Sequence, residues 1–413
     1  MRSNRRPGPQ RPHLTQTPFT GTPVSQRLCK VGVKNSGFDR LNHRRLSLSK
    51  PIRVYLCHSW LLFILFLITP VFLFSQNLTL SQKAGQVILA AIDGSKTLAP
   101  YMKNILEEAS PGGILLFRYN LNASPAENAI YIEEISKVVA NKAAGIRPFM
   151  AVDQEGGTVQ RFVGGYARLP NASSYAASPA ADPLAALQRD AAKAAKDMQA
   201  IGINLNLAPL GEVLRAENEP FLKERSYGPD TNFVYNACTR FINAMQANGI
   251  ICVLKHFPDS GSGDPHKGEQ HVPYSKAELT GIAAPMIKLL HNNEASAVMV
   301  SHAVIDRIDD TQAGSMSEKV ITEWLQGEIG FNGLIIADDF SMAGALAGSA
   351  AAKDPNAAAI KALAAGVDMV ICWPPDIKKL HKAIINAVHT GILPEERLDN
   401  AVSKIIKLKV NHE

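Results

Sequence analysis

The chain has 413 residues, with 43 Lys and Arg against 37 Asp and Glu and a formal net charge of +6. The basic excess lies in the first 53 residues, which contain 12 Lys or Arg and one acidic residue, Asp39, so the remainder carries a net charge of −5. This remainder lacks the clustered cations that displace counterions from phosphates, and we expect no nucleic-acid partner. A hydrophobic content of 46% excludes a disordered chain.

An apolar segment, Trp60–Phe74, follows the basic stretch. Its 15 residues are fewer than the roughly 20 that cross a membrane, and they are typical of a signal-peptide core. We therefore predict a basic extension, disordered or mis-assigned, over residues 1–53, a signal peptide or membrane anchor over 54–75, and one folded domain over 76–413. The expected location is outside the cytoplasm: periplasmic, secreted, or tethered to a membrane through residues 54–75.

The folded part contains three scattered cysteines, Cys238, Cys252 and Cys372, and no Cys-x-x-Cys spacing. An odd and scattered set argues against both a disulfide framework and a zinc site. We expect these thiols to be buried like small apolar side chains.

Runs rich in Ile, Val and Leu recur eight times, at Gln86–Ile92, Ile114–Phe117, Pro148–Asp153, Ile203–Leu207, Ile250–Lys255, Ala297–Ser301, Gly333–Ala337 and Asp368–Cys372. They are nearly continuous in apolar character, as parallel strands covered on both faces are. Stretches with helical patterning lie between them, at Ala126–Asn141, Pro183–Ala200, Asn232–Asn248, Ser317–Gly327 and Asn356–Ala365.

The alternation of strands and helices predicts an α/β fold, a single (β/α)8 barrel of the TIM type. Asp182 followed by Pro183 is a helix start signal. The Ala-rich tract Ala343–Ala365 is predicted to be helical, and Asp376–Glu413 is predicted to form closing helices. In such a barrel the chemistry lies where strands end and loops begin, so polar residues at those places are the candidates for a site.

The third predicted strand ends in Asp153-Gln154-Glu155-Gly156-Gly157, and Arg161 follows closely. Two carboxylates, a glycine pair and a guanidinium therefore crowd one turn, where the glycines permit a tight backbone. A capped turn with a surface ion pair is the alternative interpretation.

The fifth predicted strand ends in Lys255-His256 and leads into a glycine-rich loop that contains Asp264-Pro265-His266. In an extended segment residues i and i+2 point the same way, so the Asp264 carboxylate can hydrogen-bond to His266. Such a bond sets the tautomer of the imidazole and raises its basicity. An isolated pair of this kind is usually solvated, but its place after a barrel strand favours a site.

The seventh predicted strand ends in Asp338-Asp339. Carboxylates beside a buried strand are costly unless they are partnered, and helix capping explains one of the two, most naturally Asp339. Arg225 and His302 also lie at strand ends or in the loops beyond. Singly they indicate a surface cation and a packed imidazole, but jointly with the other polar groups they predict a cleft that binds hydroxyl groups.

These three motifs in this order resemble those of glycoside hydrolase family 3, and within it the bacterial β-N-acetylhexosaminidases. The resemblance extends from about Leu80 to Lys407. It implies a barrel that removes terminal β-linked N-acetylglucosamine, commonly from cell-wall fragments, with retention of configuration. It also implies that the enzyme uses no metal or other cofactor.

The resemblance assigns roles by position. Asp338 matches the nucleophile, His266 matches the general acid/base, and Asp264 matches the residue that orients His266. The positions that bind the sugar are matched by Asp153, Arg161, Arg225, Lys255 and His256.

The sequence departs from the family pattern around the acid/base loop. Asp259 stands where glycine is usual, Ser260 where a second histidine is usual, and Glu212 in a turn that usually carries Asp. Thr158 replaces a common arginine, and the stretch to Asp264 is short. The gap from His266 to Pro273 is longer than usual, which predicts that the loop is rebuilt.

The sequence is also compatible with other activities. They are a β-glucosidase-like or phosphorolytic reaction of the same family, and an exported sugar-binding protein without catalysis. A Schiff-base lyase with Lys255 as the amine leaves the Asp338-Asp339 pair without a role. A metal-dependent hydrolase is disfavoured because the folded part contains no histidine before His256.

Overall fold

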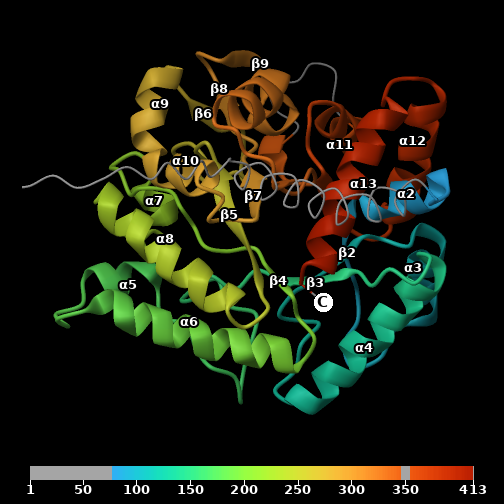
Figure 1. Cartoon of the computed structure of the whole chain (residues 1–413), viewed down its shortest axis with the longest axis horizontal. Helices are drawn as coiled ribbons and strands as arrows, with labels where there is room; N and C mark the ends of the chain where they lie inside the picture. Colours follow the sequence, from blue (N-terminus) through green and yellow to red (C-terminus); the bar gives the residue numbers. More distant parts are fainter. Residues whose placement is uncertain (1–76, 346–353, 413) are drawn as a thin grey trace, which may run out of the picture. The chain divides into compact units, whose positions relative to one another are not determined.

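The computed structural model describes residues 77–345 and 354–412. At its centre, eight parallel strands close into a barrel (Figure 1). In chain order they are β1 (Ile88–Ala91), β2 (Gly113–Leu116), β3 (Phe149–Val152), β4 (Leu205–Asn206), β5 (Ile251–Phe257), β7 (Ala297–Val300), β10 (Leu334–Ala337) and β11 (Met369–Cys372). Neighbours around the barrel follow the chain order, and β11 pairs with β1. The prediction of a TIM-type barrel is confirmed.

Every residue of these eight strands is buried. One face of each strand points into the barrel and the other is covered by helices, which explains why the runs are apolar throughout. The interior is tight at the start of β2, where a Cβ on Gly113 would lie 2.7 Å from Cδ1 of Leu89. The three cysteines are free and buried, as expected from their spacing.

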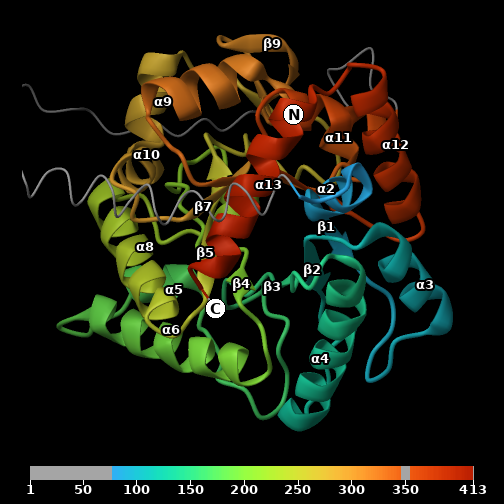
Figure 2. The same cartoon turned by 45° about the vertical axis from the view of Figure 1, so that its right-hand side comes forward.

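Helices surround the barrel, as Figures 1 and 2 show for α4, α6 and α8. The longer ones are α3 (Pro100–Ala109), α4 (Pro125–Lys142), α6 (Pro183–Ala200), α8 (Thr231–Gln246), α10 (Ala284–His291), α11 (Pro355–Ala364), α12 (Ile377–His389) and α13 (Glu395–Val410). The predicted start of α6 is confirmed, because the Asp182 carboxylate accepts a hydrogen bond from the Ala185 backbone N–H at 2.9 Å. The stretch predicted as helical at Ser317–Gly327 forms a π-helix, Lys319–Glu328.

The Ala-rich tract differs from its prediction as one helix. Ala343–Ala345 forms a 3-10 turn, and α11 begins only at Pro355, while residues 346–353 lie outside the described part. The later start has a local cause. Asp354 caps the helix through the Asn356 backbone N–H, and Pro355 disfavours helical backbone in the residue before it.

Several short elements carry no clear sequence pattern, and the sequence did not predict them. They are the helices α2 (Leu80–Gln86), α5 (Ala172–Ala176), α7 (Glu219–Leu222) and α9 (Lys276–Ile282), the 3-10 turn Gly314–Met316, and the strands β6 (His271–Val272), β8 (Val304–Ile305) and β9 (Asp309–Ala313). The three strands form a separate small sheet. It lies beyond the C-terminal ends of β5 and β7, so the loop after β5 runs into it.

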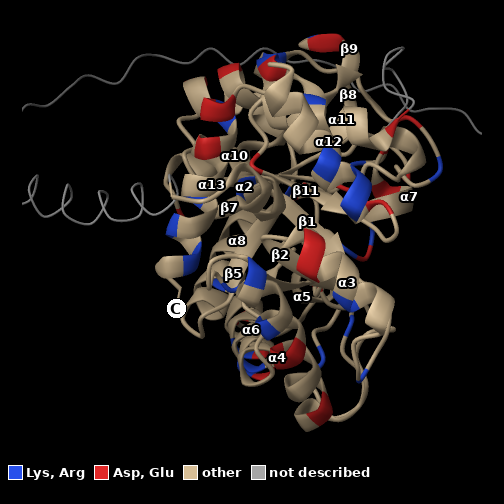
Figure 3. Cartoon of the chain, turned by 90° about the vertical axis from the view of Figure 1, so that its right-hand side faces the viewer, with Lys and Arg blue, Asp and Glu red and all other residues tan. Residues whose placement is uncertain are grey.

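Lys and Arg residues and Asp and Glu residues are both distributed over the outer helices (Figure 3). Within residues 77–345 and 354–412, no helix is both long and apolar enough to cross a bilayer. The predicted basic extension (1–53) and the predicted signal peptide or anchor (54–75) lie outside the described residues.

Candidate active site

A pocket of about 420 Å³ opens at the C-terminal ends of the barrel strands. Residues at or just beyond the ends of β2, β3, β4, β5, β7, β10 and β11 line it. Seven of the predicted site residues line this pocket: Asp153, Arg161, Arg225, Lys255, His256, His266 and Asp338. The eighth, Asp264, hydrogen-bonds to His266. The fold thus brings residues from distant parts of the chain to one pocket.

The Asp153 carboxylate directly follows β3 and binds two cations. Its Oδ2 accepts a hydrogen bond from Nη2 of Arg161 at 2.7 Å, and its Oδ1 accepts one from Nζ of Lys255, also at 2.7 Å. Arg161 lies over the ring of Phe117, 5.5 Å from its centroid. These groups present charged donors and acceptors in fixed positions, as the recognition of sugar hydroxyls requires.

Glu155 is a buried carboxylate that the sequence motif contained but that was not predicted as a site residue. It accepts two hydrogen bonds from Arg225, at 2.9 and 2.7 Å, and its Oε1 lies 2.6 Å from Nζ of Lys255. Burial alone would raise the pKa of Glu155, but attraction to Arg225 and Lys255 outweighs it and holds this pKa well below the ordinary range. Glu155 therefore fixes two cations of the pocket.

The substitution Glu155→Gln should destabilise the fold. It leaves Lys255 and Arg225 buried beside a neutral amide, and breaking a buried ion pair from one side costs about 3–5 kcal/mol. Urea unfolding monitored by circular dichroism measures this loss. The control is Glu328→Gln, which breaks an exposed ion pair with Lys276 and should leave the unfolding midpoint unchanged. Equal midpoints for both variants would contradict the structural role of Glu155.

Lys255 and His256 are consecutive in β5, yet both line the pocket. The register of β5 against β7 shifts between Leu254 and Phe257, and such irregularities turn side chains away from strict alternation. Nδ1 of His256 lies 2.7 Å from Oε1 of the buried Glu212. Burial would raise the pKa of Glu212, but hydrogen bonds from His256 and Ser260 lower it, so an ionised carboxylate fixes the tautomer of His256.

Asp338 and Asp339 follow β10 and have different partners. Asp339 accepts hydrogen bonds from the backbone N–H and the hydroxyl of Ser341, at 2.8 and 2.7 Å, and from the indole N–H of Trp373. Oδ1 of Asp338 accepts the backbone N–H of Asp339 at 2.8 Å, and within the described residues Oδ2 has no hydrogen-bond donor. Both side chains line the pocket, but the oxygens of Asp339 are engaged by Ser341 and Trp373, whereas Oδ2 of Asp338 is open to a substrate.

The environment of Asp338 favours its charged form. Burial alone would raise its pKa, but the nearby imidazoles of His256 and His302 and the backbone N–H of Asp339 lower it. His302 is buried, and its Nδ1 lies 2.7 Å from the Ser315 hydroxyl. Asp338 is therefore an ionised carboxylate near neutral pH, as a nucleophile must be.

The loop between β5 and β6 carries Asp264 and His266. Oδ1 of Asp264 lies 2.8 Å from Nδ1 of His266 and also accepts the His266 backbone N–H at 3.0 Å. The His266 side chain is 67% exposed, so it reaches bulk water as well as the pocket. The loop touches the segment after Asp338, because the Gly344 backbone N–H donates to the Pro265 carbonyl at 2.9 Å.

Aromatic side chains at the pocket were not predicted. Phe117 follows β2 and Trp373 follows β11, and their ring centroids lie 4.6 Å apart. Phe221, in α7, lies under the Arg225 guanidinium at 4.9 Å. Phe117 is the last residue of a predicted strand and Trp373 directly follows another, so the barrel rule could have identified them, whereas nothing in the sequence indicated Phe221.

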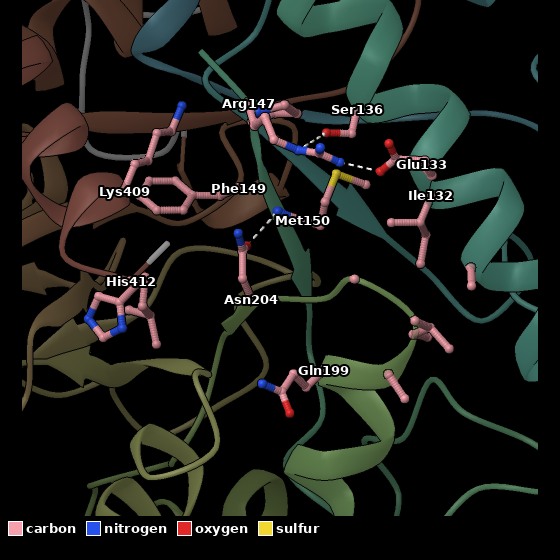
Figure 4. A pocket seen from close by; sticks show the side chains of 16 residues that line it. Ile132, Glu133, Ser136, Arg147, Phe149, Met150, Gln199, Asn204, Lys409 and His412 are labelled. Atoms are coloured by element: carbon pink, nitrogen blue, oxygen red, sulfur yellow. Dashed lines mark hydrogen bonds and ion pairs between the residues drawn. The ribbon is translucent and has the colours of Figure 1, made fainter. Parts of the chain in front are cut away.

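A second pocket of about 420 Å³ lies at the opposite end of the barrel, between α4, α6 and α13 (Figure 4). Several of its polar side chains are engaged with the surrounding structure. Arg147 binds Glu133 and, at 3.1 Å, the Ser136 hydroxyl, and Oδ1 of Asn204 accepts the Met150 backbone N–H at 2.8 Å. Contacts at this end of a TIM barrel serve stability, so the reactive pocket is the other one.

Comparisons with known proteins agree with this geometry. Residues 79–408 match the sequence profile of the glycosyl hydrolase family 3 N-terminal domain. The chain is 30% identical over 299 residues to a β-hexosaminidase of Xanthomonas campestris pv. campestris, covering 70% of this chain and 85% of that protein. It is 32% identical over 283 residues to a β-hexosaminidase of Methylococcus capsulatus, covering 66% of this chain and 79% of that protein.

Solved structures are similar as well. A family 3 β-N-acetylglucosaminidase from a Paenibacillus species superposes with a TM-score of 0.74 and 26% identity, over 81% of this chain and 63% of that one. A β-N-acetylhexosaminidase from Beutenbergia cavernae superposes with a TM-score of 0.72 and 26% identity, over 81% of this chain and 99% of that one.

Proposed function

The chain belongs to glycosyl hydrolase family 3, and we propose that it removes terminal β-linked N-acetylglucosamine from carbohydrate chains with retention of configuration. One observation carries the mechanism: Asp338 on a strand end and His266 on a loop line the same pocket. A retaining enzyme needs a nucleophile on one face of the anomeric carbon and a proton donor at the leaving oxygen.

In the first step, the ionised Asp338 carboxylate attacks the anomeric carbon, and the bond to the leaving oxygen breaks. His266 donates the proton that this oxygen needs, and Asp264 stabilises the imidazolium through Nδ1. The result is a covalent glycosyl-enzyme on Asp338. The cluster of Asp153, Arg161 and Lys255 holds the hydroxyl groups of the sugar while the reaction proceeds.

In the second step, the neutral His266 accepts a proton from water, and the resulting oxygen attacks the anomeric carbon. The ester to Asp338 breaks, the sugar leaves with its original configuration, and His266 is again protonated. The high exposure of His266 supports this role, because it allows exchange of protons with solvent.

The relatives support the choice of sugar, since they are named as β-hexosaminidases and β-N-acetylglucosaminidases. The pocket also contains apolar side chains beside its charged cluster: Leu115, Leu207, Met299, Met342 and Ile371. An acetamido group has a methyl as well as an amide, so a pocket with both kinds of surface suits it.

The deciding experiment compares release of p-nitrophenol from the β-N-acetylglucosaminide and from the β-glucoside, with the protein begun at Gln76. A preference for the acetamido sugar supports the proposal. Preference for the glucoside would indicate a β-glucosidase, and faster turnover with added phosphate would indicate phosphorolysis. Binding of N-acetylglucosamine without release from either substrate would indicate a sugar-binding protein.

We propose, from the basic and apolar segments before residue 76, that the enzyme is exported from a bacterial cytoplasm and acts on cell-wall fragments. Fractionation of cells that express the full chain tests this location. Enzyme found in the cytoplasmic fraction at full length would contradict it, and enzyme in the membrane fraction would identify residues 54–75 as an anchor.

A further inference from the structure

Two departures from the family pattern near the acid/base loop, Glu212 and Ser260, are in direct contact, and a third, Asp259, precedes Ser260 in the chain. Glu212, Arg215 and Glu217 belong to the segment after β4, and each binds a residue near an end of the loop between β5 and β6. Oε2 of Glu212 accepts the backbone N–H and the hydroxyl of Ser260, at 2.9 and 2.7 Å. This connects the start of the loop to the carboxylate that also holds His256.

Arg215 and Glu217 extend these contacts to both ends of the loop. Nη2 of Arg215 donates to Oδ2 of Asp259 at 2.7 Å, and its Nε donates to Oε1 of Glu217 at 2.7 Å. The same Glu217 oxygen accepts the hydroxyl of Tyr274 at 2.6 Å, and Tyr274 follows β6, beyond the end of the loop. Arg215 therefore binds Asp259 directly and is connected to Tyr274 through Glu217.

Asp259 is unusual because it is almost fully buried. Burial and the nearby Glu212 carboxylate raise its pKa to about 7, against the attraction of Arg215. A buried aspartate beside another carboxylate is costly, and a glycine at this position would avoid the cost. The ion pair with Arg215 offsets part of this cost and fixes the position of Asp259. The backbone of Asp259 is held as well, because its carbonyl accepts the Ser301 hydroxyl at 2.7 Å.

We propose that Arg215 and Asp259, with Glu212 and Ser260, are positioning residues that hold the loop of His266 against the pocket. The expected effect on catalysis rests on the proposed function, whereas the expected effect on the position of the loop does not. Of these four residues, only Ser260 lines the pocket, so Arg215 and Asp259 act through the loop and not through contact with the sugar.

Two measurements test the proposal. The first is hydrogen exchange of the backbone amides of residues 261–268 in Arg215→Gln and in Asp259→Asn. Exchange should accelerate at least about tenfold in this loop and stay unchanged in the barrel strands. The control is Arg147→Gln, which breaks an arginine pair at the opposite end of the barrel and should not affect the loop. Unchanged loop exchange in both test variants would overturn the proposal, whether or not the enzyme acts on the proposed sugar.

The second measurement is kcat/KM for two substrates, a disaccharide of N-acetylglucosamine and the p-nitrophenyl β-glycoside of N-acetylglucosamine. Arg215→Gln should lower the disaccharide value about 10- to 100-fold, as misplaced catalytic groups do, and should change the aryl value little. In a His266→Ala background the same substitution should have no further effect. Losses that are equal for both substrates, or that add to the loss from His266→Ala, would overturn the proposal.

The proposal can be tested even if one variant fails to fold. If Arg215→Gln fails to fold, Ser260→Ala removes a single hydrogen bond to Glu212 and should give the same pattern at smaller size. A wild-type enzyme that is inactive on both substrates would refute the proposed function, while the exchange measurement would still decide whether these residues hold the loop.

Discussion

Asp338→Ala should lower turnover by roughly 10⁴-fold or more and leave the fold intact, because removal of a nucleophile leaves only binding and orientation to accelerate the reaction. The side chain lines the pocket, and its Oδ2 has no hydrogen-bond donor within the described residues. The groups that lower the pKa of Asp338 stabilise its charge in the folded state, so the variant should lose some stability at neutral pH and still fold. Release of p-nitrophenol and the unfolding midpoint measure the two effects.

The matched control is the neighbouring substitution Asp339→Asn. An asparagine retains an acceptor for the Ser341 backbone N–H, so the turn should persist and activity should fall much less than in Asp338→Ala. Incubation with a slow substrate followed by mass measurement should locate the sugar on Asp338. Ordinary activity in Asp338→Ala, or a sugar attached to Asp339, would show that the nucleophile is not Asp338.

His266→Ala should reduce kcat/KM by about 10²- to 10⁴-fold for a disaccharide, the usual contribution of a general acid. The sugar alcohol that departs needs a proton, whereas p-nitrophenolate departs without one, so the first step with the aryl glycoside should be little affected. The second step also uses His266 as a base. The variant should therefore release a burst of p-nitrophenol and then accumulate the glycosyl-enzyme.

Rapid-mixing absorbance resolves the burst, and intact-protein mass identifies the accumulated adduct. Asp264→Asn serves as a comparison, because it retains the acceptor position beside Nδ1 but loses the charge that stabilises the imidazolium. Its effect should be smaller than that of His266→Ala and should follow the same dependence on the leaving group. An equal loss on both substrates in His266→Ala would contradict the assignment of the acid/base.

Much of the architecture could be predicted from the sequence alone because it depends on local patterns. A strand covered on both faces must be apolar throughout, and eight such runs separated by helical stretches allow few folds besides a closed barrel. The motif residues Asp153, Lys255 and Asp338 each stand at the end of such a run, so the barrel places them at one rim. The start of α6 could also be predicted locally, because Asp182 and Pro183 form the cap and the first turn.

The tertiary structure decided which charged groups meet. Glu155, Lys255 and Arg225 lie far apart in sequence, and only the closed barrel brings them together, since an ion pair depends on distance in space and not on a local pattern. The same is true of Arg215 and Asp259, which are 44 residues apart in sequence and form an ion pair at 2.7 Å. Local sequence patterns therefore determined the scaffold and the positions of the candidate residues, whereas long-range packing determined their partners and hence their charge states.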